Sequence, residues 1–166
     1  MQYCEKLTEK WGKVLWVTTD YAEVGVALDF GIRVVHLSCP GMENLFYEQP
    51  ADLSDGNATP GGWKLYGGHR MWFAPEGDWS YYPDNEPVTY RVSENTVLVE
   101  QKTDPWTGQK KLLKLNFRET SIDLENIFIN DINFAVNFRD FYTAIRFFKK
   151  SFINTTNNIT ISNNFI

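Results

Sequence analysis

Short apolar segments separated by turn residues run through the first two thirds of the chain. Several of them are rich in β-branched and aromatic residues, and others alternate apolar with polar side chains, which is typical of β-strands. The predicted strands are Lys13–Asp20, Val24–Asp29, Ile32–Ser38, Val88–Val92, Thr96–Thr103 and Lys111–Phe117. Asp104–Gly108 separates the last two strands and completes a hairpin signature. No segment before residue 118 shows sustained helical periodicity, so we predict a mainly β fold, an antiparallel sheet or sandwich over residues 13–117.

The chain beyond residue 117 has a different composition. All 11 Gly, all 7 Pro and all 6 Trp lie at or before Gly108, whereas residues 118–166 hold eight of the 12 Phe. Apolar residues at spacings of three and four predict a short C-terminal helix over residues 135–150. The final residues are low in complexity and β-prone. We therefore divide the chain into residues 1–117 and an atypical tail, residues 118–166.

Length and charge limit the classes of function. A chain of 166 residues is one ordinary domain that can bury a core, and its net charge of −5 provides no basic footprint for nucleic acid or for an anionic membrane surface. No apolar run is long enough to span a membrane. Two cysteines are too few for a disulfide framework, and the charged start is unlike a signal peptide. We expect a cytoplasmic protein with neither nucleic acid nor membrane as its partner.

The stretch from Gly61 to Val88 carries most of the candidate chemistry. Glycines and prolines set sharp, stiff turns there, between aromatic rings and ionisable side chains. Flat apolar faces beside converging hydrogen-bonding groups suit a sugar ring, so the expected ligand is a monosaccharide or sugar derivative. The candidate site residues are His69, Arg70, Trp72, Glu76, Trp79, Asp84 and Glu86.

Structural interpretations compete with these functional ones. His69 in a Gly-rich turn could equally fix a loop by hydrogen bonding, and Asp84 and Glu86 could cap a turn. His36 lies within an apolar segment, which favours a strand residue over a site. Trp72 and Trp79 stand beside charged residues and are candidates for stacking on a sugar. The His, Asp and Glu residues do not have metal-ligand spacing, so we expect no metal and no other cofactor.

One resemblance to a known family rests on several motifs in order. The runs YGGHRMW, APE and YYPDNEPV follow ENLFY at 43–47 and precede DPWTG at 104–108. Together they resemble the amino-terminal half of an uncharacterised bacterial family related to galactose mutarotase, over roughly residues 10–117. The resemblance implies a partial β-supersandwich, because such domains normally run well past 200 residues.

The same resemblance implies roles for individual residues. Mutarotation requires a base that takes the proton of the anomeric hydroxyl and an acid that protonates the ring oxygen. In the mutarotases a histidine is the acid and a glutamate is the base, so His69 matches the acid and Arg70 would hold hydroxyls or a phosphate. The glutamate base of that superfamily lies in the later half, which has no counterpart here, and Glu86 is the second catalytic candidate in this chain.

Three hypotheses of function follow. The chain is a sugar-binding, mutarotase-like domain without catalysis, an active aldose epimerase or related carbohydrate enzyme, or a truncated or frame-shifted product without function. Half of a supersandwich would leave sheet edges unpaired. We therefore also expect some self-association through those edges.

Overall fold

The computed structural model describes residues 1–49, 66–71, 86–105, 108–130 and 157–162. All regular elements in this part of the chain are β-strands, which confirms the mainly β prediction. They are β1 (Gln2–Thr8), β2 (Gly12–Thr18), β3 (Glu23–Ala27), β4 (Arg33–Ser38), β5 (His69–Arg70), β6 (Thr89–Ser93), β7 (Thr96–Glu100), β8 (Gln109–Phe117), β9 (Ser121–Asn130) and β10 (Asn157–Ser162). None of the described residues forms a helix long and apolar enough to cross a bilayer.

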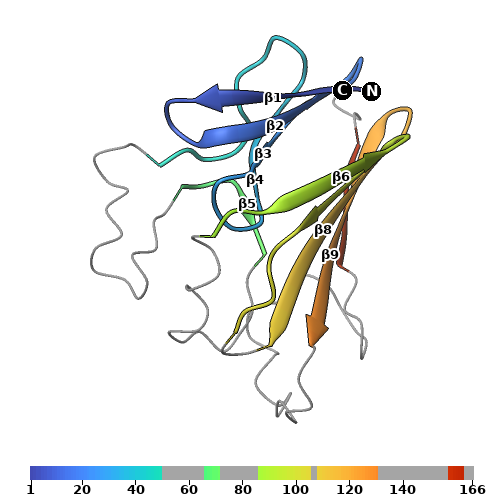
Figure 1. Ribbon diagram of the computed structural model, residues 1–166. Helices are drawn as coiled ribbons and strands as arrows, with labels where there is room; N and C mark the ends of the chain where they lie inside the picture. The colour runs from blue at the N-terminus through green and yellow to red at the C-terminus, as the bar shows by residue number, and fades with distance from the viewer. Residues whose placement is uncertain (50–65, 72–85, 106–107, 131–156, 163–166) are drawn as a thin grey trace.

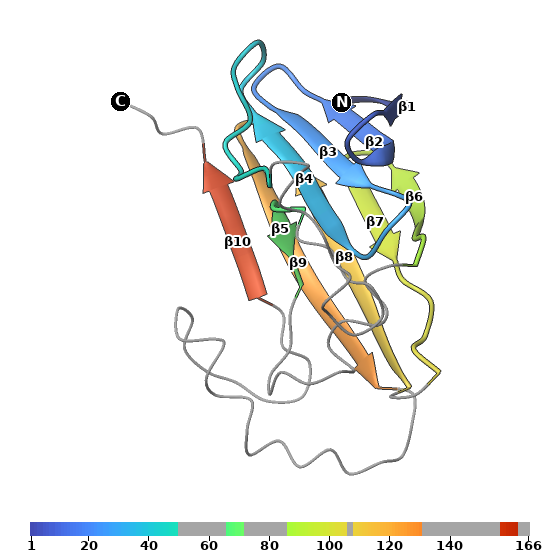
Figure 2. The same ribbon diagram turned by 90° about the vertical axis from the view of Figure 1, so that its left-hand side faces the viewer.

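The ten strands of the described residues form two five-stranded antiparallel sheets, and within each sheet the strands that pair are consecutive in the sequence. The first sheet has the order β1-β2-β3-β4-β5, and the second has the order β10-β9-β8-β7-β6. The sheets lie face to face, with β1 and β6 near one border and β5, β9 and β10 towards the other (Figures 1 and 2). This arrangement is a β-sandwich in its coarse form.

Alternation along the strands explains why the sheets pack together. On β2, Leu15 and Val17 face the second sheet, and on β8, Leu113 and Leu115 face the first; all four side chains are fully or almost fully buried. Further valines, leucines and isoleucines of β3, β4, β7 and β9 complete this inter-sheet core. Burying a side chain of this size contributes roughly 1.5–3 kcal/mol, so the core is the main source of stability.

The outer face of the first sheet carries a second, smaller apolar cluster. It consists of Trp11, Val14, Ala27, Phe30 and Val35, with Trp16 and Tyr66 packed against it. The first sheet is therefore apolar on both faces. A β-bulge also lies where β3 pairs with β4, because Gly25 is opposite His36 while the next residue, Val26, is opposite Val34.

The predicted strands and the observed ones differ at several places. All six predicted strands exist, with ends shifted by a few residues. The sequence did not predict β1, whose seven residues include two charges and lack a clear apolar pattern. The second sheet continues past Phe117, because β9 pairs with β8 from Phe117↔Ile122 to Gln109↔Asn130. The predicted helix at 135–150 lies outside the described residues.

Side chains also join the two sheets at their ends. The Tyr21 hydroxyl lies 2.7 Å from the carbonyl oxygen of Arg118 and 2.8 Å from that of Ser121, so it holds the β8–β9 turn against the first sheet. The Tyr90 hydroxyl on β6 donates to Glu5 Oε1 on β1 at 2.7 Å. This bond is the main cause that raises the pKa of Tyr90 to about 12, because ionising the phenol would place two negative charges together.

Candidate functional site

Two consecutive glycines lead the chain into β5. Gly67 and Gly68 have φ of +81° and +76°, a left-handed backbone that residues with a Cβ rarely adopt. Gly67 forms an isolated bridge with Glu48, and Gly68 N donates to Tyr47 O at 3.1 Å. His69 then pairs with Val34 on β4, so the glycines of the motif place the histidine at the end of the first sheet.

His69 and Arg70 lie on opposite faces of the first sheet. His69 is opposite Val34, which belongs to the inter-sheet core, whereas Arg70 is opposite Arg33. Consecutive side chains of a strand alternate between faces, so only His69 points into the space between the sheets. Its Nε2 lies 3.3 Å from Asn126 Oδ1 on β9, which links β5 to the second sheet.

The outer side of this strand has its own contacts. Arg33 is buried, its guanidinium donates to Gly67 O at 2.7 Å, and it lies 5.7 Å from the centre of the Tyr66 ring. Tyr66 in turn stacks on Phe30 with ring centroids 3.9 Å apart. Arg33, together with the stacked rings of Tyr66 and Phe30, therefore supports the backbone of the glycine turn on the outer face of the first sheet.

Buried polar side chains replace the apolar core beside His69. Gln101, Lys111 and Asn126 are 2%, 3% and 8% exposed, and we call these three residues and His69 the polar end of the core. Lys111 and Asn126 continue the core-facing alternation of β8 and β9, and Gln101 N donates to Lys111 O at 3.1 Å. Lys111 Nζ lies 3.5 Å from Met71 O, two residues beyond His69. Asn126 and Lys111 of the second sheet thus both contact the segment 66–71, Asn126 through His69 and Lys111 through Met71 O.

The electrostatics of this end favour a neutral histidine. Burial lowers the pKa of His69; the contact with Asn126 opposes the change, and the positive charge of Arg33 adds to it. His69 is therefore uncharged at neutral pH. Because Asn126 Oδ1 can only accept, Nε2–H is the donor and Nδ1 is the accepting nitrogen of the ring. A ring in this state is suited to accept a hydroxyl hydrogen bond or a proton.

The remaining predicted site residues are distributed as follows. Glu86 has an exposed side chain, and its carbonyl oxygen accepts from Gly31 N at 2.9 Å in the link between β3 and β4. Trp72, Glu76, Trp79 and Asp84 lie outside the described residues. His36 is a strand residue, as predicted; its Nε2 lies 2.9 Å from Ser38 Oγ. In the described part of the chain, no group of three or more His, Cys, Asp and Glu side chains could hold a metal ion.

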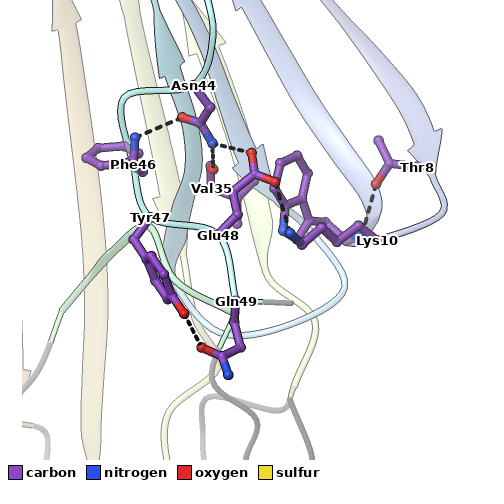
Figure 3. A network of polar contacts seen from close by, with 9 residues as sticks. Thr8, Lys10, Val35, Asn44, Phe46, Tyr47, Glu48 and Gln49 are labelled. Atoms are coloured by element: carbon purple, nitrogen blue, oxygen red, sulfur yellow. Dashed lines mark hydrogen bonds and ion pairs between the residues drawn. The ribbon is translucent and has the colours of Figure 1, made fainter. Parts of the chain in front are cut away.

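A second polar network, beside β4, was not predicted from the sequence (Figure 3). Asn44 Oδ1 accepts from Leu37 N at 3.0 Å and Phe46 N at 3.1 Å, while its Nδ2 donates to Val35 O and Glu48 Oε1 at 2.8 and 2.7 Å. The other carboxylate oxygen of Glu48 pairs with Lys10 Nζ at 2.9 Å. The signal available in the sequence was Asn44 immediately before the apolar run Leu45–Tyr47.

This network orders the chain that approaches the glycine turn. Partial burial raises the pKa of Glu48, but the hydrogen bonds from Asn44 and Lys10 outweigh it, so the pKa lies below its usual value. The carboxylate is therefore ionised at neutral pH. Because Glu48 also bridges Gly67, we interpret the network as a support for the turn that positions His69.

No protein-family model matches this chain, and no curated protein or solved structure is similar enough to be recognised as a relative. The relation to the galactose mutarotase family therefore stays a prediction that rests on the quoted motifs.

Proposed function

We propose that this chain is a carbohydrate-binding domain whose site includes the polar end of the core. The finer fold that we propose for its two sheets is a partial β-supersandwich of the mutarotase type. Cys4 and Cys39 do not form a disulfide, which suits a cytoplasmic setting.

The contact between His69 and Asn126 is the observation that carries the proposal. This contact joins the two sheets through polar side chains at one end of a core that is otherwise apolar, and the choice of polar residues there needs a reason. Binding is such a reason, because sugar hydroxyls need donors and acceptors held in fixed directions. An amide, an ammonium and a neutral imidazole provide both kinds of group.

The segment that follows supplies the complementary chemistry. Residues 72–85 begin directly after Met71, whose carbonyl oxygen lies beside Lys111 Nζ. This segment contains Trp72 and Trp79, the rings that we propose for stacking, and Glu76 and Asp84 as further hydrogen-bonding groups. The proposed site thus combines the polar end of the core with the aromatic stretch attached to it.

Titration with monosaccharides tests the proposal. Tryptophan fluorescence and calorimetry would be recorded with galactose, glucose and mannose, for the wild type and for Asn126→Ala. Loss of one hydrogen-bonding group should weaken binding about tenfold. Asn116→Ala is the matched control, because Asn116 accepts from Thr96 on the outer face of the second sheet. A wild type that binds none of the sugars, or equal affinity in both variants, would overturn the proposal.

Aldose epimerase activity is the second candidate, and the neutral state of His69 favours it. A ring nitrogen that can accept a proton could take one from an anomeric hydroxyl. His69 would then act as the base, whereas the resemblance implies that it is the acid. Polarimetry of fresh α-galactose measures this directly. Mutarotation faster than the spontaneous rate in the wild type, but not in His69→Gln, would support it; equal rates would exclude it.

A further inference from the structure

Strand β1 lies at an open border of the first sheet (Figure 2). Among the described residues it pairs with β2 alone, and Gln2–Leu7 are all exposed. One row of its backbone N–H and C=O groups therefore faces solvent. An edge of this kind is a template for another strand, and proteins usually protect it with charges, prolines or bulges.

Apolar side chains increase the tendency of this edge to pair. Tyr3 and Leu7 are 55% and 84% exposed and point to the same face, because they are separated by an even number of residues. Both are among the few large apolar side chains that are exposed to solvent in the described part of the chain. Covering them would remove apolar surface from water.

The two charges of β1 protect the edge poorly, because each interacts with its own molecule. Glu5 accepts from the Tyr90 hydroxyl and lies 4.0 Å from Lys13 Nζ. Lys6 Nζ lies 5.9 Å from the centre of the Trp16 ring. Both charged side chains thus have partners within their own molecule.

We propose that β1 pairs antiparallel with β1 of a second copy of this chain, about a two-fold axis at Cys4. An axis perpendicular to the sheet keeps each face on its own side, so it must pass through a residue position. An axis at Glu5 would place two carboxylates opposite each other, and one at Lys6 would do the same with two ammonium groups. Like charges directly opposite are unfavourable.

The axis at Cys4 avoids both conflicts. It pairs Tyr3 with Glu5 of the second copy, Gln2 with Lys6, and Met1 with Leu7. No like charges are then opposite, and the whole run from Met1 to Leu7 takes part. Axes at Tyr3 or Leu7 would pair fewer residues of the strand.

Cysteine crosslinking tests the register. Directly opposite residues have Cβ atoms about 4.5–5.5 Å apart, close enough for a disulfide after a small adjustment. Copper-phenanthroline should therefore produce a covalent dimer with the wild type and with Cys39→Ser, but not with Cys4→Ser. The register control combines Cys4→Ser with Glu5→Cys, which separates the two thiols along the strands and should crosslink much less. Equal crosslinking of this control and the wild type would overturn the register.

Charge substitution at Tyr3 tests the pairing without cysteine chemistry. Tyr3→Glu places a carboxylate opposite Glu5 twice in each dimer and should weaken association about tenfold. Tyr3→Lys, which places an ammonium there, should keep or strengthen it. Light scattering after size-exclusion chromatography, over a range of concentrations, measures the effect. A wild type that stays monomeric at every concentration, or an equal effect of both substitutions, would overturn the proposal.

Discussion

A Cβ atom added to Gly67 would stand 1.9 Å from the carbonyl oxygen of Tyr47. The same oxygen accepts the hydrogen bond of Gly68 N, so backbone groups hold the two chain segments in close contact. The close approach explains why the turn before His69 consists of glycines. It also leaves less room for a side chain at Gly67 than at Gly41, where an added Cβ would have nothing within 4 Å.

Gly67→Ala should destabilise the protein more than Gly41→Ala. Gly41 has φ of +74° and nothing within 4 Å of an added Cβ, so its substitution costs only the strain of the left-handed backbone, about 1–2 kcal/mol. At Gly67 a clash with backbone adds about 1–3 kcal/mol. Urea denaturation of both variants measures the difference, and equal losses would show that the turn can move away from Tyr47.

Asn44→Ala should lower the free energy of unfolding by about 1–3 kcal/mol, because it leaves backbone groups of β4 and the following loop without a partner. Asn44→Asp keeps the acceptor for Leu37 N and Phe46 N but brings a negative charge next to Glu48. Its stability loss should therefore shrink as the pH falls through the carboxyl range. A pH-independent loss in Asn44→Asp would contradict the assigned contacts.

Both histidines should make the protein less stable in mild acid. Burial lowers the pKa of His36, against the opposing charges of Glu23 and Glu48, and burial also lowers that of His69. Below the unfolded value, about 6.5, the unfolded chain binds protons that the folded chain does not, so the free energy of unfolding falls until the folded pKa values are passed.

Urea denaturation between pH 5 and 8 measures this dependence. The double variant His36→Gln, His69→Gln should be nearly independent of pH from about 5 to 7. The lowered pKa values of Glu48 and Glu100 reduce stability only at more acidic pH, as the pH falls from their usual value of 4.5 towards the folded values. A wild type that gains stability on acidification from pH 7 would contradict the direction of both histidine shifts.

Leu113→Ala should cost about 2–5 kcal/mol, because Leu113 is completely buried between the sheets and its truncation leaves a cavity. Leu45→Ala is the control: Leu45 is 62% exposed, and a surface truncation of this kind usually changes stability by less than about 0.5 kcal/mol. Thermal and urea unfolding of the two variants give the comparison. Similar losses would show that the two sheets do not share one core.

The pattern of side chains determined much of the fold. Alternation in segments such as Thr96–Glu100 and β-branched residues in segments such as Gly12–Thr18 predicted the strands, since both act within a few residues of sequence. The glycine turn before His69 and the strand position of His36 could be predicted for the same reason. The mainly β class therefore followed from local pattern.

The pairing of strands, and contacts between segments far apart in the sequence, decided the rest. Strand β1 has no clear apolar pattern, and it becomes a strand because all seven of its residues pair with β2. Lys10 and Glu48 are 38 residues apart, and His69 and Asn126 are 57 apart, so no local pattern could join them. His69 and Arg70 are adjacent in the sequence, yet their pairing with β4 sends them to opposite faces of the sheet. The sequence determines that side chains alternate; only the partner strand and its register decide which face each residue occupies.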